Sequence, residues 1–112
     1  MTRTRTLGSR DVQRVRGDSR FREAVRSDRP EPGWRARGLC LRHDPEVFFP
    51  GTLEDPTPAV AICGGCPVRG ACLATALDIG ECDGVWGGTT PRERRAMRQV
   101  WARSPVRTAS SN

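Results

Sequence analysis

The sequence predicts a small all-α protein with a bundle of about four short helices. Three observations lead to this class: prolines and glycines that start and stop helices, apolar residues at helical spacing, and no alternating strand pattern. The chain has 112 residues, enough for one small domain. Only 36% of the residues are apolar and Tyr is absent, so the hydrophobic core should be thin. We therefore expect a metal or disulfide bonds to help hold the fold.

Residues 1–33 have the composition of a basic arm. Arg alternates there with Thr, Ser, Gly and Asp, and apolar residues are sparse. Such a composition is typical of a solvated, disordered segment, which we predict here. Asp18 could still cap a short helix that reaches Arg26. The stretch DRPEPG, residues 28–33, reads as a linker because of its two prolines and its glycine.

Two helical segments are predicted in the middle of the chain. The run 39–49 contains a helical turn or two, ended by a Pro-Gly pair. Asp55 or Thr57 can cap a helix that has Pro58 at its first position and stops at the glycine pair 64–65. No part of this stretch alternates apolar and polar residues, so no strand is expected.

Two further helices are predicted in the last third. The segment 67–79 begins with Pro, keeps apolar residues at helical spacing and ends at Gly80. The segment GVWGG, residues 84–88, is a glycine-rich turn around a Trp. The sequence TPRE at 90–93 is a capping box, so a basic helix should follow it and stop at Ser104, before a proline.

Four of the five cysteines are spaced to share one metal centre. Cys63 and Cys66 form a C-x2-C pair, Cys72 follows on the next predicted helix, and Cys40 is the natural fourth ligand upstream. Structural zinc sites usually use two such pairs, and dithiol redox sites lie near βαβ patterns. One pair with two single cysteines is common around iron–sulfur clusters, so we favour a cluster and keep zinc and dithiol chemistry as alternatives. Cys82, between two acidic residues, is interpreted as a spectator thiol.

The charge of the chain is distributed unevenly. The net charge is +6 and all 19 basic residues are Arg. Arginines gather before residue 40 and after residue 90, whereas the cysteine-containing middle is acidic. Because Arg can bind phosphate and guanine with paired hydrogen bonds, nucleic acid is a candidate partner. No secretory signal and no membrane-length apolar run is present, so we expect a cytoplasmic protein with no membrane partner.

The motifs GWRARGLC, DPEVFFP, CGGCPVRGAC, ALDIG, GVWGG and TPRERRA, in this order, resemble the WhiB-like proteins of actinobacteria and their phages. The resemblance implies an oxygen- and nitric-oxide-sensitive transcriptional regulator, whose small helical fold wraps around one [4Fe-4S] cluster. It covers residues 34–103, which we take as the WhiB-like domain, between the arm at 1–33 and a flexible tail at 104–112. Four cysteines would hold the cluster: Cys40, Cys63, Cys66 and Cys72.

The resemblance also implies a protein partner, region 4 of the principal sigma factor, bound by a monomer of this chain. Glycines around Trp86 should leave its ring prominent, as an interface anchor. Phe48 and Phe49 are neighbours, so one should pack near the cluster and the other point outward. The predicted sigma-factor contacts are Trp34, Phe48, Phe49, Gly84, Val85, Trp86, Gly87 and Gly88.

DNA is the second partner that the resemblance implies, through the basic segment after the GVWGG turn. Six arginines stand there against one acid, which exceeds what solubility needs, so we interpret them as phosphate contacts. The tail lacks the RGRP segment with which one subgroup enters minor grooves, so that mode is not expected. The predicted DNA contacts are Arg92, Arg94, Arg95, Arg98, Arg103 and Arg107.

Two other classes of function stay open as alternatives. Some members are reported as protein disulfide reductases when they lack the cluster, which here would use Cys63 and Cys66. The sequence offers no adjacent base or substrate pocket, so we expect no enzyme with a small-molecule substrate and at most a side activity. The other alternative is a zinc-stabilised basic module that binds DNA without sensing anything.

Overall fold

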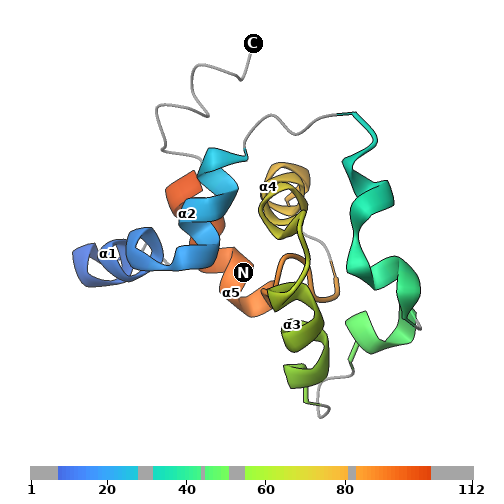
Figure 1. Ribbon diagram of the computed structural model, residues 1–112. Helices are drawn as coiled ribbons and strands as arrows, with labels where there is room; N and C mark the ends of the chain where they lie inside the picture. Colours follow the sequence, from blue (N-terminus) through green and yellow to red (C-terminus); the bar gives the residue numbers. More distant parts are fainter. Residues whose placement is uncertain (1–7, 28–31, 44, 51–54, 81–82, 102–112) are drawn as a thin grey trace.

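The computed structural model is built from helices (Figure 1). It describes residues 8–27, 32–43, 45–50, 55–80 and 83–101. These residues contain no strand, only an isolated bridge between Trp86 and Thr89, so the predicted all-α class is confirmed. None of the described helices is long and apolar enough to span a membrane. The elements are α1 (Ser9–Gly17), α2 (Ser19–Arg26), the 3-10 helices η1 (Trp34–Arg37), η2 (Leu39–Arg42) and η3 (Pro45–Phe48), α3 (Thr57–Gly64), α4 (Arg69–Ile79) and α5 (Pro91–Trp101).

Within the predicted basic arm, α1 and α2 form a docked hairpin, so the prediction of disorder is wrong for residues 8–27. The few apolar residues recur at helical spacing and therefore share one face of each helix. Val15, Phe21 and Ala24 are all buried. The predicted cap is confirmed, because the Asp18 carboxylate accepts a hydrogen bond from the Arg20 N–H at 2.9 Å. Residues 1–7 lie outside the described part of the chain.

The hairpin, α4 and α5 enclose the main hydrophobic core. The rings of Phe21 and Trp101 meet edge to face, with centroids 6.0 Å apart. The Trp101 indole N–H donates to Asp78 Oδ1 at 3.0 Å. At Gly70 the helices α2 and α4 approach so closely that a Cβ atom would lie 2.6 Å from Ser27 Oγ. Buried residues of this core are Val15, Phe21, Ala24, Leu73, Ala74, Leu77, Met97, Val100 and Trp101.

The start of α5 follows the prediction closely. The Thr90 N–H donates to Glu93 Oε1 at 3.0 Å and the Glu93 N–H to Thr90 Oγ1 at 3.3 Å, which is the capping box. The start of α4 differs from the prediction by two residues, because Pro67 lies in the turn that follows Cys66. The expected end of α5 at Ser104 falls outside the described residues.

The three 3-10 helices lie on the far side of α4 from the hairpin, and α3 lies below α4, in contact with η2 and η3 (Figure 1). Of the three 3-10 helices, η2 and η3 are the form taken by the helical turns predicted for 39–49. The segment is tied to the GVWGG turn, because the Val85 N–H donates to the Phe48 carbonyl oxygen at 2.7 Å. Gly84, with φ of +86°, makes this possible, since a Cβ there would lie 2.8 Å from the same oxygen. The 3-10 helices, α3, α4 and the turn together border a space.

We predict that Phe21→Ala lowers the free energy of unfolding by about 3–5 kcal/mol, because it empties a buried ring position in the main core. Urea unfolding of the full chain, followed by circular dichroism, measures the change. Arg22→Ala is the matched control, since its side chain is exposed on the same helix and should change stability by about 0.5 kcal/mol or less. A similarly small loss for Phe21→Ala would show that the hairpin does not belong to the fold.

Candidate metal centre

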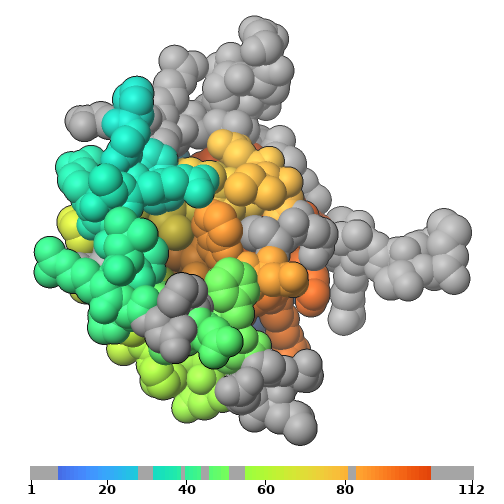
Figure 2. Space-filling view, turned by 90° about the vertical axis from the view of Figure 1, so that its right-hand side faces the viewer, coloured from blue at the N-terminus to red at the C-terminus, as the bar shows by residue number. Residues whose placement is uncertain are grey.

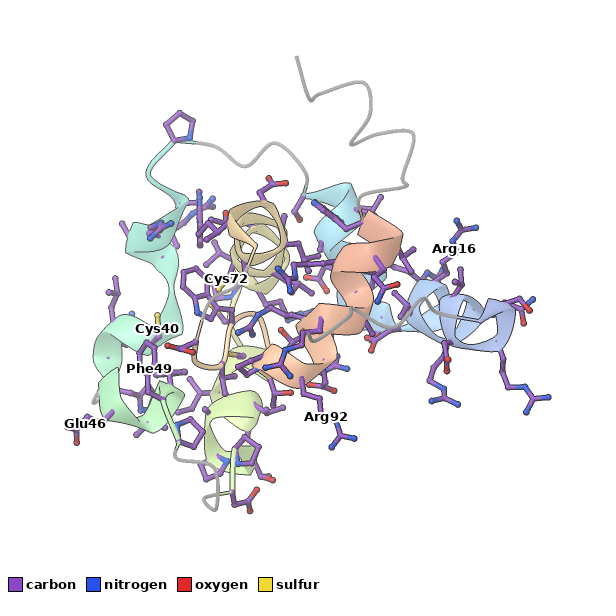
Figure 3. The ribbon with its side chains drawn as sticks, turned by 180° about the vertical axis from the view of Figure 1, so that it is seen from behind. Arg16, Cys40, Glu46, Phe49, Cys72 and Arg92 are labelled. Atoms are coloured by element: carbon purple, nitrogen blue, oxygen red, sulfur yellow. The ribbon has the colours of Figure 1, made fainter. Side chains whose placement is uncertain are left out.

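The four predicted ligand cysteines line one cavity of about 480 Å³. Cys40 comes from η2, Cys63 from the end of α3, Cys66 from the loop after it and Cys72 from the first turn of α4. Cys63 and Cys66 are buried, Cys72 is half-buried and Cys40 is exposed, and all four are free thiols. Figure 3 shows the sulfurs of Cys40 and Cys72 on these two separate elements. Cys82 lies outside the described residues.

Apolar side chains make up much of the remaining wall of this cavity. They include Phe48, Ile62 and Val85, together with the rings of Trp34 and Trp86. Such a wall lowers the polarity of the surroundings, which strengthens electrostatic interactions beside it. In the space-filling view, the teal and green atoms of the 3-10 helices lie beside the orange atoms of the turn (Figure 2).

Backbone amides of the GVWGG turn point at two of the sulfurs. The N–H groups of Gly88 and Gly87 donate to the Cys63 sulfur, and the Gly87 N–H also donates to the Cys72 sulfur. Gly87 has φ of +57°, and a Cβ there would lie 2.7 Å from the Leu73 Cβ. Only glycine therefore lets the turn lie this close to α4 and aim its amides at the sulfurs.

Burial raises the pKa of the Cys63 thiol and raises the pKa of the Cys72 thiol to about 12. The amide hydrogen bonds oppose this effect on each pKa, and the neighbouring cysteines add to it. At neutral pH the two groups are therefore protonated unless a cation stabilises the thiolates. A bound metal would stabilise the two thiolates, and the thiols would release their protons on binding it.

The thiols surround a space and do not converge on one point. In the described part of the chain, no three His, Cys, Asp or Glu side chains are grouped closely enough to hold a metal ion. Around a tetrahedral zinc, bonds of about 2.3 Å would bring the ligand sulfurs to about 4 Å from each other. The four cysteines therefore share a cavity without forming the compact tetrahedral arrangement of a zinc site in the described part of the chain.

Two arginines hold the GVWGG turn in place. Arg94 of α5 donates from Nη1 to the Thr89 carbonyl oxygen at 2.6 Å and from Nη2 to the Gly84 carbonyl oxygen at 2.7 Å. Arg20 of α2 donates from Nη1 to the Gly88 carbonyl oxygen at 2.7 Å. The turn is thus fixed from α5 on one side and from the hairpin on the other.

Arg20 is in turn held by two carboxylates, from Asp18 and Glu93. Partial burial alone would raise the pKa of each carboxyl group, but hydrogen bonds from Arg20 outweigh it and hold each pKa below its usual value. The Thr90 N–H lowers the pKa of Glu93 further. Both carboxylates are therefore charged at neutral pH, and the pairing with Arg20 is complete there.

A second connection runs from the hairpin to the loop between Cys63 and Cys66. Arg69 donates from Nε to Glu23 Oε1 at 3.0 Å. Its Nη1 donates to the carbonyl oxygens of Gly64 at 3.0 Å and of Cys66 at 3.5 Å. Arg69 therefore satisfies the Gly64 carbonyl group at the end of α3, which has no partner within the helix.

Arg94 corrects the predicted set of DNA contacts. Its side chain is only 2% exposed and is used inside the protein, so the prediction that it contacts phosphates is wrong. Arg92 and Arg95 are exposed and Arg98 is half-buried. The last two members of the predicted set, Arg103 and Arg107, lie outside the described residues.

The predicted aromatic contact set also needs correction. Phe48 is 6% exposed and packs beside Cys63, whereas Phe49 is 57% exposed, so the predicted division between the neighbours is confirmed. Phe48 itself, Val85 and the glycines at 84, 87 and 88 are buried and shape the turn, so they present no contact surface. Trp34 and Trp86 are half-buried.

Several residues of the site were not found by sequence reasoning. Leu41 on η2 and Val47 on η3 are exposed apolar side chains. Phe49, which is also exposed, directly follows η3. The sequence did contain a signal for Leu41 and Val47, because they are apolar and lie in short helical turns, which have little surface to bury them. Arg20 and Arg69 gave no signal, since each finds its partners far away in the sequence.

The fold and the site define a small helical protein that presents four cysteines to one cavity, with two backbone amides donating to two of the sulfurs. A sequence model of the family described as "Transcription factor WhiB" matches residues 34–97. The chain therefore belongs to the WhiB family of transcription factors, as its motifs predicted. The helices α1 and α2 precede the matched region.

Individual relatives agree with this assignment. "Transcriptional regulator WhiB1" of Mycobacterium tuberculosis is 42% identical over 82 residues, which cover 67% of this chain and 95% of the relative. "Transcriptional regulator WhiB2" of Mycolicibacterium smegmatis is 44% identical over 75 residues, covering 67% and 58%. "Transcriptional regulator WhiB" of Streptomyces coelicolor is 44% identical over 70 residues, covering 62% and 80%.

Proposed function

We propose that this protein is a transcriptional regulator that holds one [4Fe-4S] cluster with Cys40, Cys63, Cys66 and Cys72. The observation that carries the proposal is that four free thiols line one apolar cavity, and that two backbone amides donate to two of their sulfurs. Cysteine thiolates are the usual ligands of such clusters. The relatives named as transcriptional regulators support the regulatory role. When bound, the cluster would supply a centre that reacts with oxygen and nitric oxide.

The chain's own residues would do three things at this site. The cysteines lie on η2, at the end of α3 and on α4, so a shared ligand would join three chain segments and its binding free energy would add to the stability of the fold. The amides of the turn would neutralise part of the charge on the sulfurs. The aromatic wall would limit water access. Loss of the ligand would shift the population toward a looser arrangement of these segments, which is how a signal would reach the partners.

We predict that protein purified without oxygen contains about four iron and four sulfide per chain. Cys63→Ser and Cys66→Ser should lose most of this iron, because each removes a ligand from the wall of the cavity. Cys82→Ser is the matched control and should retain it, since Cys82 is the spectator thiol of the predicted set. Iron and sulfide analysis, with zinc measured in parallel, decides the outcome. One zinc per chain and no sulfide would favour the zinc alternative instead.

The proposed protein partner is region 4 of the principal sigma factor, as the resemblance implies. The exposed apolar side chains of Leu41, Val47 and Phe49 support a contact surface over η2 and η3. Trp34 and Trp86, both partly exposed, border the same cavity. Exposed aromatic and apolar side chains gathered on one surface are typical of protein interfaces.

We predict that Phe49→Ala weakens binding to the isolated sigma region 4 by about tenfold or more, which is the effect of removing an interface anchor. Ile79→Ala is the control, because Ile79 is 56% exposed, much like Phe49 at 57%, but lies at the end of α4 and does not line the cysteine cavity. Calorimetric titration of the cluster-loaded variants gives both affinities. Equal affinities would contradict the proposed surface.

The proposed DNA contacts begin with Arg92, Arg95 and Arg98 on α5. Figure 3 shows Arg92 pointing away from the body of the protein. The acid of this helix, Glu93, is engaged with Arg20, so the outer face of α5 keeps a positive charge. Arginines on the exposed face of a helix are suited to phosphates, and none of the described residues is assigned a role in base readout. Arg103 and Arg107 stay predictions for the same role.

We predict that replacing Arg92 and Arg95 together by Gln weakens binding to unrelated DNA duplexes alike. The slope of log affinity against log salt should fall by about two units, one for each phosphate that is no longer neutralised. Arg42→Gln, on the exposed surface of η2, is the control and should leave the slope unchanged. Fluorescence anisotropy at several salt concentrations measures it. A weakening confined to one DNA sequence would contradict pure phosphate binding.

A disulfide reductase is not favoured by the site. Catalytic dithiols depend on a lowered thiol pKa, whereas burial raises the pKa of Cys63, the first cysteine of the C-x2-C pair. The protonated, buried thiol would be a poor nucleophile at neutral pH.

A further inference from the structure

We propose that the hairpin of α1 and α2 controls how firmly the cysteine site holds its cluster, with Arg20 as the positioning residue. The inference rests on the proposed function for the cluster itself. The hairpin lies before the region that the WhiB family model matches, so family membership assigns it no role. Two independent sets of contacts support the inference. Both run between α2 and the segments that carry the cysteines and the amides.

The first set of contacts uses every hydrogen-bond donor of the Arg20 guanidinium. Nε donates to Asp18 Oδ1 at 3.0 Å, and Nη2 to Asp18 Oδ2 at 2.6 Å and Glu93 Oε2 at 3.0 Å. Nη1 donates to Glu93 Oε1 at 3.1 Å and to the Gly88 carbonyl oxygen at 2.7 Å. A guanidinium has five N–H groups, and all five are used. Its orientation is therefore fixed by two carboxylates, and the Gly88 carbonyl is bound in a fixed place.

Gly88 connects this contact to the cysteines. Its carbonyl oxygen accepts from Arg20, and its own N–H donates to the Cys63 sulfur. The paired hydrogen bonds between Trp86 and Thr89 hold the ends of the tight turn that contains Gly88, which has φ of +79° and no side chain. Arg20 adds the restraint from α2 on the Gly88 carbonyl, so the placement of the N–H···S hydrogen bond also depends on α2.

The second set of contacts runs from Glu23, one turn further along α2. Its carboxylate accepts from Arg69, which binds the carbonyl oxygens of Gly64 and Cys66. These carbonyls bracket the loop between Cys63 and Cys66. The C-x2-C loop and the glycine turn are thus held by the same helix, at points well separated along the chain.

Movement of the hairpin would relax both segments at once. Hydrogen bonds to cluster sulfurs stabilise the more negative, reduced state, so their loss should lower the reduction potential. The same loss loosens the site and should speed release of the cluster, because partners outside the ligand shell typically change metal affinity by about 10–100-fold. Anything that binds and displaces the hairpin would act on the cluster by this route.

The test compares cluster-loaded full-length Arg20→Lys and Arg20→Gln with Arg22→Gln. Lys keeps the charge but cannot make the five hydrogen bonds, and Arg22 is an exposed arginine of the same helix, so it controls for charge. We expect both Arg20 variants to have a lower reduction potential and to lose the cluster to a chelator about tenfold faster. The Arg22 variant should match the parent protein.

Two outcomes would overturn the inference. If the Arg20 variants had the same reduction potential as the parent protein, Arg20 would contribute only to the stability of the fold, even if the cluster were lost faster. Equal loss rates would remove its effect on the site altogether.

A preparation that contains no iron or sulfide would contradict the proposed function, and the inference is then judged on the thiols alone. In that case the buried Cys63 thiol should become more accessible when the two segments loosen, so in the Arg20 variants it should react with iodoacetamide faster than in Arg22→Gln, by peptide mass spectrometry. An unchanged rate would overturn the inference, while circular dichroism verifies that the helices persist.

Discussion

The position of the GVWGG turn against α4 is the constraint on which the rest of the structure depends. Gly87 lies so close to α4 that a side chain would collide with Arg69 and Leu73, and its φ of +57° suits glycine. This approach brings the Gly87 and Gly88 amides to the sulfurs of Cys63 and Cys72. The same turn receives η3 through the Val85 N–H. A displacement of the turn would therefore alter the cavity on two sides.

Arginine does two different jobs in this protein, and composition alone does not separate them. Arg20, Arg69 and Arg94 bind backbone carbonyl oxygens of the segments that form the site. The guanidinium suits this role because it offers several N–H donors in a fixed plane, which Lys does not. On α5, Arg92 and Arg95 instead face solvent. In this chain, whose basic residues are all Arg, arginines therefore provide hydrogen bonds to backbone carbonyl groups as well as a positively charged surface.

Local signals predicted the parts of the structure that depend on neighbouring residues. The capping box at Thr90 and Glu93, and the division between Phe48 and Phe49, follow from spacing alone, and both are confirmed. The grouping of the four cysteines around one cavity was also within reach, because family resemblance and spacing agreed on them. Arg94 was misjudged because helical position does not tell whether a long side chain turns inward to a carbonyl. That outcome depends on where the turn lies in space.

The docked hairpin was missed for a similar reason. Its sparse apolar residues looked too few for a core, but α4 supplies the opposite surface, where Gly70 and the small residues around it let α2 come close. Burial depends on this partner surface, which lies some fifty residues further along the chain. The low hydrophobicity of residues 8–27 therefore predicted disorder, although contacts with distant residues of α4 fold this segment into helices.

The location of the cores indicates what a bound cluster would stabilise. The main core of the hairpin, α4 and α5 includes no cysteine among its described members. Each of the two smaller clusters beside the cavity does include one, Cys63 in the first and Cys66 in the second. The half of the protein with the main core therefore has a larger apolar core without cysteines, whereas the half with the 3-10 helices and α3 has only small apolar clusters among its described residues, each of which includes a cysteine. Removal of a shared ligand should act first on η1, η2, η3 and α3, which carry Leu41 and Phe49 at the proposed partner surface. The state of the site would then reach that surface directly, since the segment that supplies Cys40 is the segment that supplies the surface.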